Sequence, residues 1–165
     1  MSPRSPATIA LSLGLAAFAL IVGALGFQYL GQFPPCEMCM WQRYPHIAAG
    51  LVGIGGFLFL RGNILPSSAG KGVAIATALL VGLSGLIGVY HAGVEWHWWP
   101  GPQSCTGAAF RGALDLNAPV VMCDHAAWRL FGLSLAGYNA VLSLALAATG
   151  LTLAARIRRH PWAKR

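Results

Sequence analysis

Four cysteines carry the most evident chemistry of this 165-residue chain, and they form two different kinds of pair. Cys36 and Cys39 make a C-x-x-C motif, whereas Cys105 and Cys123 stand at the two ends of a longer segment. Cysteine pairs of these kinds serve in thiol–disulfide exchange, in metal binding or as structural disulfides. The surroundings of each pair therefore have to distinguish these uses.

The C-x-x-C motif lies where a helix is expected to begin. Pro34 and Pro35 precede it, and a long apolar stretch follows. The positive end of a helix dipole and a nearby cation, here Arg43, both stabilise the thiolate, which is the reactive form of cysteine. If the helix has begun by Cys36, then Cys36, Cys39 and Arg43 share one face. The pattern favours a reactive dithiol.

Four apolar stretches must position these cysteines. Hydrophobic residues make up 56% of the chain and charged residues only 9%, against about 25% charged in soluble domains. So few polar side chains indicate a lipid environment. We therefore expect an all-α integral membrane protein, a single domain over 1–165, built as a four-transmembrane-helix bundle. The expected spans are 7–30, 40–60, 72–94 and 130–155, the first being longer than a signal peptide's apolar region.

The distribution of charge predicts how the bundle is oriented. Four spans place both termini on the same side of the membrane as the 61–71 loop. That side holds every Lys and Arg of the chain except Arg43, Arg111 and Arg129. The positive-inside rule puts that side in the cytoplasm. The loops 31–39 and 95–129, with all four cysteines, then face outward, which in a bacterium is the periplasm, where disulfides persist. The net charge of +7 thus reports topology, and we expect no nucleic-acid partner.

Three polar residues near the outer ends of the helices are further candidates. Arg43 is a cation close to the bilayer, which is costly and commonly functional. Its alternative role is to extend to the lipid headgroups, and the sequence leaves the two open. His91 and Glu95 are four residues apart and are expected to pair, as a polar cap at a helix end rather than in direct catalysis.

The second cysteine pair lies in the long outward loop, and two roles for it remain open. A disulfide between Cys105 and Cys123 would be a structural staple worth roughly 3 kcal/mol in the loop-entropy model. A redox role instead needs an exposed and exchangeable bond, which the surrounding prolines and glycines favour. A short helix lying on the membrane surface is expected within the loop, over 108–116.

Three other uses of these cysteine and histidine residues are alternatives to thiol–disulfide exchange. A zinc site of four thiolates would lack the second close pair that zinc ribbons show, so we expect no metal. Haem needs histidines at matching depth within facing helices, but the five histidines lie at the outer boundary or in the C-terminal tail. A membrane scaffold with two structural disulfides is the remaining alternative.

The motifs of the chain, taken in order, resemble the disulfide bond formation protein B family, the quinone-linked thiol oxidoreductases of bacterial inner membranes. Vitamin K epoxide reductase-type enzymes also pair thiols with quinones, but in them the C-x-x-C follows the loop cysteines. The matching elements are Pro35-Cys36-x-x-Cys39-x-x-Gln42-Arg43, Tyr90-His91-x-x-x-Glu95, Cys105, Cys123-Asp124 through Trp128, and Phe131-Gly132-Leu133-Ser134.

The resemblance implies a role for each cysteine. Cys105 would form a mixed disulfide with a periplasmic thioredoxin-fold oxidase similar to disulfide bond formation protein A (DsbA-like). Cys123 would relay electrons to Cys36, and the Cys39 thiolate would contact a membrane quinone, either ubiquinone or menaquinone. Arg43 would support the quinone and the thiolate, and His91 would line the same pocket. The implied function is reoxidation of the partner in support of protein disulfide formation.

The resemblance also sets an energetic requirement. The family's partner is a strong oxidant, at about −120 mV, whereas stable structural disulfides lie below about −300 mV. Reoxidising the partner with such a bond would be uphill by roughly 180 mV, or about 8 kcal/mol for two electrons. At least one cysteine pair must therefore be unusually oxidising or be coupled to a stronger acceptor, and a quinone in the lipid is such an acceptor.

Overall fold

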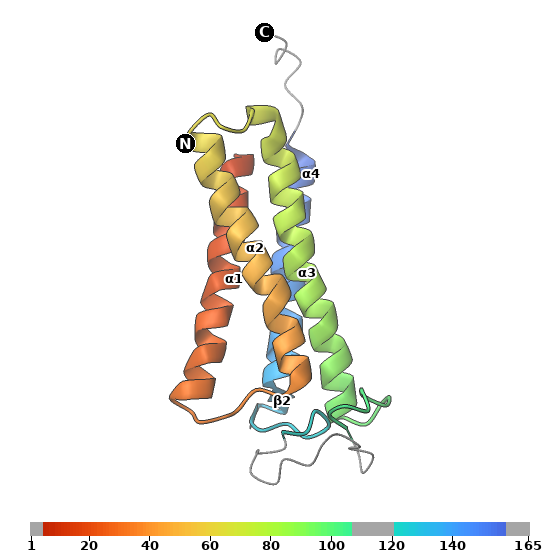
Figure 1. Cartoon of the computed structure of the whole chain (residues 1–165). Coiled ribbons are helices and arrows are strands. Elements are labelled where there is room, and N and C mark those ends of the chain that lie inside the picture. The colour runs from red at the N-terminus through yellow and green to blue at the C-terminus, as the bar shows by residue number, and fades with distance from the viewer. Residues whose placement is uncertain (1–4, 107–120, 158–165) are drawn as a thin grey trace.

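Four long helices dominate the computed structural model, which describes residues 5–106 and 121–157 (Figure 1). Each helix is long and apolar enough to cross a membrane. The four-helix membrane bundle expected from the sequence is confirmed, and the chain is a multi-pass membrane protein. The helices are α1 (Pro6–Tyr29), α2 (Glu37–Arg61), α3 (Gly70–Glu95) and α4 (Leu135–Arg156), with a 3-10 turn η1 (Ser67–Ala69) before α3.

The start of the fourth span corrects the expectation of a helix from position 130, since α4 begins at Leu135. Two short antiparallel strands, β1 (Arg129–Leu130) and β2 (Leu133–Ser134), precede α4. Phe131 and Gly132 between them have φ of 47° and 82°, as two-residue hairpin turns of type I′ require. A helix cannot pass through such a turn. It begins instead after Ser134, whose Oγ accepts a hydrogen bond from the backbone N–H of Gly137.

Close approach of helix backbones holds the bundle together. Helix α1 packs on α2, α2 on α3, and α3 on α4, while α1 also contacts α3 and α4. A Cβ atom added at Gly53 of α2 would lie 2.5 Å from the carbonyl oxygen of Ala10 in α1. One added at Gly88 of α3 would lie 3.0 Å from the carbonyl oxygen of Ala136 in α4. Small residues of this kind allow membrane helices to approach closely.

All four cysteines lie at one end of the bundle. The connection between α1 and α2 and the segment between α3 and α4 both lie there, whereas the α2–α3 connection lies at the opposite end (Figure 1). The loop that follows α3 is tied back to that helix, because Trp99 Nε1 donates a 2.8 Å hydrogen bond to the carbonyl oxygen of Tyr90. The expected surface helix over 108–116 lies outside the described residues.

Candidate functional site

The C-x-x-C motif forms the first turn of α2. Cys36 is the N-cap, and its Sγ accepts a hydrogen bond from the backbone N–H of Cys39 at 3.2 Å. Both cysteines are free thiols, and their sulfur atoms are 2.7 Å apart. The hydrogen bond to Cys39 and burial raise the pKa of the Cys36 thiol above its usual range, so Cys36 keeps its proton in the reduced pair.

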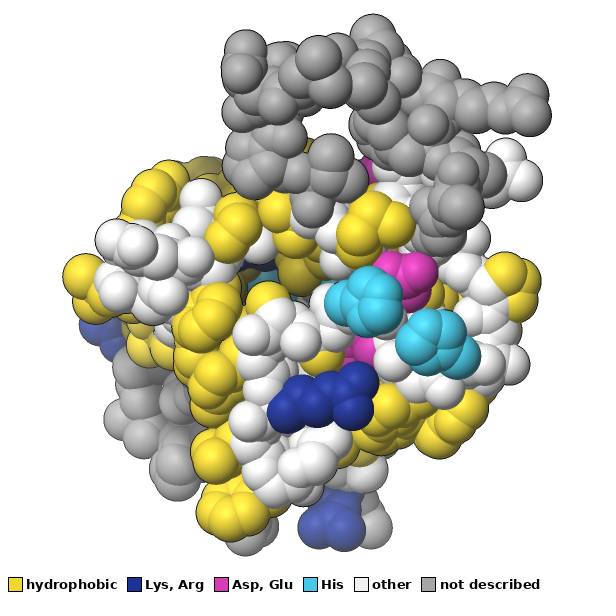
Figure 2. All heavy atoms as spheres, turned by 90° about the horizontal axis from the view of Figure 1, so that it is seen from below, with side chains coloured by type: hydrophobic (Ala, Val, Ile, Leu, Met, Phe, Trp, Pro, Cys, Tyr) yellow, Lys and Arg dark blue, Asp and Glu magenta, His cyan; other side chains and the backbone are white. Residues whose placement is uncertain are grey.

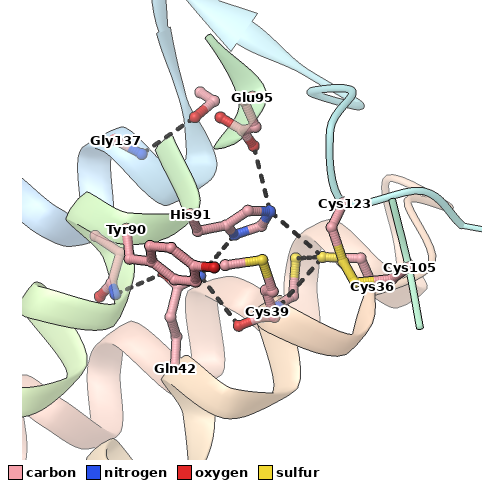
Figure 3. Close-up of polar contacts among 12 residues, drawn as sticks. Cys36, Cys39, Gln42, Tyr90, His91, Glu95, Cys105, Cys123 and Gly137 are labelled. Atoms are coloured by element: carbon pink, nitrogen blue, oxygen red, sulfur yellow. Dashed lines mark hydrogen bonds and ion pairs between the residues drawn. A yellow bond between two sulfur atoms is a disulfide. The ribbon is translucent and has the colours of Figure 1, made fainter. Parts of the chain in front are cut away.

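The loop pair is joined as a Cys105–Cys123 disulfide and packs directly on the C-x-x-C motif (Figure 3). The backbone N–H of Cys123 donates a 2.7 Å hydrogen bond to the carbonyl oxygen of Cys105, which closes the loop at this point. Cys105 and Cys123 are 5% and 0% exposed. The expectation of an exposed disulfide is therefore wrong for this arrangement, because the loop folds its disulfide inward against Cys36 and Met38.

These pairings also bear on the two alternatives in which both cysteine pairs are in the same state, either four thiolates on a metal or two disulfides. A zinc site of four thiolates is not formed, since two of the sulfur atoms are bonded to each other. A scaffold with two structural disulfides is not what the structure shows either, since Cys36 and Cys39 are free. A smaller donor group does occur: the sulfur atoms of Cys36 and Cys39 and a ring nitrogen of His91 lie within 4.8 Å of one another.

His91 reaches the cysteines from α3. Its Nε2 lies 3.6 Å from Cys36 Sγ and 3.7 Å from Glu95 Oε1, while its Nδ1 lies 2.8 Å from Gln42 Nε2 (Figure 3). His91 and Glu95 are both buried. The expected pairing of these two residues is confirmed as a side-chain contact, and the imidazole also lies against the sulfur atom of Cys36.

A connected row of polar side chains, buried except for the half-buried Asn139, continues from His91 into the bundle. Asn139 of α4 donates to Gln42 Oε1 at 2.8 Å, and its Oδ1 lies 2.9 Å from His46 Nε2. Ser143 donates to Asn139 Oδ1 at 2.9 Å. This row of polar side chains thus links α2, α3 and α4. His46, Asn139 and Ser143 were not among the residues expected at the site. Two pairs of polar residues, each at a spacing of four within an apolar helix, are the signal that could have identified them.

A cavity of about 410 Å³ opens beside this chain of residues, a size typical of small-molecule sites. It extends along α1 and is closed by the start of α2, the segment before α4 and α4 itself. Its lining is mainly apolar, and its polar members include Cys36, Cys39, Arg43, His91 and Asn139. The structure therefore brings the predicted cofactor-binding residues Arg43 and His91 to one cavity with the C-x-x-C motif.

Arg43 is fixed within the protein. Its Nη1 donates a 2.6 Å hydrogen bond to Gln28 Oε1, and its Nη2 donates a 3.4 Å hydrogen bond to the carbonyl oxygen of Ala24, both on α1. The side chain is half-buried. It therefore reaches across the cavity to α1, and its role in binding a cofactor stays a prediction.

A second hollow lies on the loop face of the molecule. Figure 2 looks onto this face and shows histidine, acidic and basic side chains gathered among hydrophobic ones. The hollow is lined by Glu95, His97, Asp124, His125 and Arg129, with Trp96 and Ala126. Arg129 donates a 3.4 Å hydrogen bond to the carbonyl oxygen of Glu95. Glu95 and His125 line both hollows, so the inner cavity lies close to the polar loop surface.

Comparison with known proteins agrees with the motifs and the fold. A protein from Polaromonas sp. (strain JS666) named disulfide bond formation protein B is 27% identical over 166 residues, covering 94% of each chain. A protein of the same name from Burkholderia thailandensis is 30% identical over 159 residues, covering 90% of this chain and 87% of the relative. No solved structure matches the chain.

The family model for disulfide bond formation protein DsbB matches residues 6–153. This range runs from the start of α1 almost to the end of α4 and includes both cysteine pairs and the cavity. The chain therefore belongs to the DsbB family of membrane proteins that form disulfide bonds.

Proposed function

We propose that this protein is a quinone-dependent thiol–disulfide oxidoreductase of the bacterial inner membrane that reoxidises a DsbA-like, thioredoxin-fold dithiol protein in the periplasm. One observation carries the proposal: two cysteine pairs, one oxidised and one reduced, are packed together at an apolar cavity within a membrane bundle. A hydrophobic quinone reaches such a cavity from the lipid, whereas a soluble dithiol reaches only the loop face. The arrangement suits electron transfer between the two phases.

The proposed reaction conserves electrons and protons. The partner's dithiol gives two electrons and two protons to a quinone, which yields the partner's disulfide and a quinol. Exchange begins at Cys105, passes through Cys123 to Cys36, and ends at Cys39, which lines the cavity beside Arg43. Because Cys105 is buried in the docked loop, we expect the loop to move away from Cys36 when the partner binds.

The test is quinone reduction by purified protein in detergent, with ubiquinone or menaquinone and a reduced thioredoxin-fold dithiol protein. Loss of oxidised quinone is followed by ultraviolet absorbance. The wild type is expected to reduce quinone, while Cys39→Ser and Cys105→Ser fall to the background rate, because each breaks one step of the relay. Ser104→Ala, an exposed neighbour of Cys105, serves as the control and is expected to match the wild type.

Two results would contradict the proposal. The first is a wild-type protein that leaves both quinones oxidised while its partner stays reduced. The second is undiminished quinone reduction by Cys105→Ser, which would show that electrons bypass the loop pair. A mixed disulfide between the partner and Cys105, trapped in a Cys123→Ser sample, would support the order of exchange.

A further inference from the structure

Two backbone carbonyl groups fix the orientation of the side-chain amides beside His91. The carbonyl oxygen of Met38 lies 3.2 Å from one end of the Gln42 amide. Since a carbonyl only accepts hydrogen bonds, that end is the NH₂ group. The same reasoning identifies the NH₂ group of Asn139, which lies 3.2 Å from the carbonyl oxygen of Ser84. It also donates to Gln42 Oε1 at 2.8 Å, so each amide supports the orientation of the other.

The orientation of Gln42 determines which nitrogen of His91 carries the hydrogen. The NH₂ group of Gln42 lies 2.8 Å from His91 Nδ1, so Nδ1 accepts and, in the neutral imidazole, the hydrogen is on Nε2. Nε2 is 3.6 Å from Cys36 Sγ, within hydrogen-bonding distance for the larger sulfur atom. Its 3.7 Å separation from Glu95 Oε1 is too long for an N–H···O hydrogen bond. The Nε2–H group therefore faces Cys36 Sγ, and the backbone carbonyl group of Cys123 is a second acceptor for His91.

We propose that Gln42 and Asn139 are positioning residues that hold His91 in its Nε2–H tautomer, so that His91 stabilises the Cys36 thiolate. The Cys36 sulfur then accepts from two donors, His91 Nε2–H and the backbone N–H of Cys39. Hydrogen bonds to a charged atom are roughly twice as strong as those between neutral groups. The contact thus gains strength when Cys36 becomes an anion.

This inference rests on the proposed function, because stabilisation of the Cys36 thiolate matters in the step that releases Cys36 from a mixed disulfide. When the Cys105 thiolate attacks Cys123 in a Cys36–Cys123 mixed disulfide, the Cys105–Cys123 bond forms and the Cys36–Cys123 bond breaks. The electron pair of the broken bond stays on Cys36, which leaves as a thiolate. A leaving thiolate that is already stabilised leaves faster. The Cys36 thiolate is transient, because the raised pKa of Cys36 means that it takes up a proton once the pair is reduced. The structure shows this later arrangement, with Cys105 bonded to Cys123 and His91 beside Cys36.

The same tautomer has a second consequence. Cys36, Cys39 and His91 have the spacing of a metal site, but a nitrogen that carries hydrogen has no lone pair for a metal ion. The Gln42 and Asn139 amides would thereby keep the reduced dithiol from being captured by zinc. An acceptor at position 42 would reverse the tautomer and create a zinc site.

The experiment compares the wild type with Gln42→Glu, which keeps the shape of the side chain but places an acceptor opposite Nδ1. Full-length protein labelled with ¹⁵N-histidine is examined by NMR in detergent, and the His91 signals are assigned from a His91→Gln sample. Zinc affinity of the reduced protein and the rate at which dithiothreitol reduces the Cys36–Cys39 disulfide are measured in parallel. Thr77→Val is the control, because this buried hydroxyl bonds only within α3, to Val73.

We expect hydrogen on Nε2 and a bare Nδ1 in the wild type and in Thr77→Val. In Gln42→Glu we expect hydrogen on Nδ1, zinc binding tighter by about ten-fold or more, and disulfide reduction roughly ten-fold slower. Asn139→Leu removes one amide without adding a charge, and this variant should show both tautomers of His91. It provides a second test if Gln42→Glu does not fold.

Two results would overturn the inference. One is hydrogen on Nδ1 of His91 in the wild type. The other is a folded Gln42→Glu protein whose zinc affinity and reduction rate both stay within about two-fold of the wild type. None of these measurements uses quinone or a protein partner, so their outcome is separate from the success or failure of the proposed electron transfer.

Discussion

At the scale of single residues, the site combines a free dithiol with His91 from a second helix and with Arg43 from the same helix as the dithiol. Cys36 and Cys39 come from the start of α2, and His91 comes from α3. Arg43 lies one turn beyond Cys39 and is held by two acceptors on α1. The guanidinium group is thus fixed at the cavity before any ligand binds. If a quinone binds there as proposed, this fixed position lowers the entropy cost of contacting a quinone oxygen atom.

Replacement of Arg43 by Met should weaken quinone binding. Loss of a charge-assisted hydrogen bond to the quinone oxygen costs about 1.5–3 kcal/mol, so the KM for quinone should rise by roughly ten-fold or more in the absorbance assay. Arg43→Lys should restore part of the affinity, because a single charge remains. Lys71→Met, at the opposite end of the bundle, is the control for lost charge. An unchanged KM in Arg43→Met would show that Arg43 serves only to tie α2 to α1.

At the scale of elements, the cavity depends on how α1 sits against α2. The two helices touch through glycine, with Gly53 of α2 packed against Ala10 and Gly14 of α1. At the cysteine end, Phe27 of α1 packs against Phe33 and against Trp128 from the segment before α4. The position of α1, which forms one wall of the cavity, is therefore fixed by two kinds of contact. Backbone packing on α2 fixes it far from the cysteines, and aromatic side chains fix it at the cysteine end.

A methyl group at Gly53 should destabilise the bundle. In Gly53→Ala the new Cβ would meet the carbonyl oxygen of Ala10 at 2.5 Å and Gly14 Cα at 2.9 Å, so α1 must move away. Overpacking of this kind costs about 1–3 kcal/mol, which should lower the midpoint of thermal unfolding in detergent. Gly55→Ala is the matched control, because no atom lies within 4 Å of its added Cβ. Equal midpoints for the two variants would contradict the packing argument.

At the scale of the whole molecule, the proposed function requires the cysteine end to face the periplasm. Helix parity places the end of α4, with Arg156, and the α2–α3 connection, with Arg61 and Lys71, on the opposite side. Lys and Arg near helix ends stay preferentially in the cytoplasm. Orientation and redox compartment therefore agree, since a free dithiol and a disulfide can exchange persistently only outside the reducing cytoplasm.

Reporter fusions test this orientation. Green fluorescent protein attached after Arg165 should fluoresce, because the C-terminus is expected in the cytoplasm. Alkaline phosphatase, which needs its own disulfides to become active, should be inactive there and active when fused after Ser104 in the loop. A fusion after Ser67, in the α2–α3 connection, is the control and should behave like the C-terminal one. The reverse pattern would place the cysteines in the cytoplasm and exclude the proposed partner.

The sequence by itself determined the number of helices, their approximate limits and the end at which the cysteines gather. These features follow from local hydropathy and from helix parity, which need no knowledge of packing. The C-x-x-C motif at the start of α2 was equally readable, because prolines and an apolar stretch mark a helix start. The fourth span was placed about five residues too early, since Phe131 adopts a positive φ that its residue type does not suggest.

Only the tertiary structure decided what surrounds the reactive sulfur atoms. The disulfide of Cys105 and Cys123 lies buried against Cys36, although its glycine- and proline-rich loop predicted exposure. Gln42 contacts His91, which lies 49 positions away in the sequence, and Asn139, which lies 97 positions away. Such contacts depend on the rotation of each helix about its axis and on the depth at which neighbouring helices cross. Close backbone packing sets both, and no local pattern in the chain encodes either.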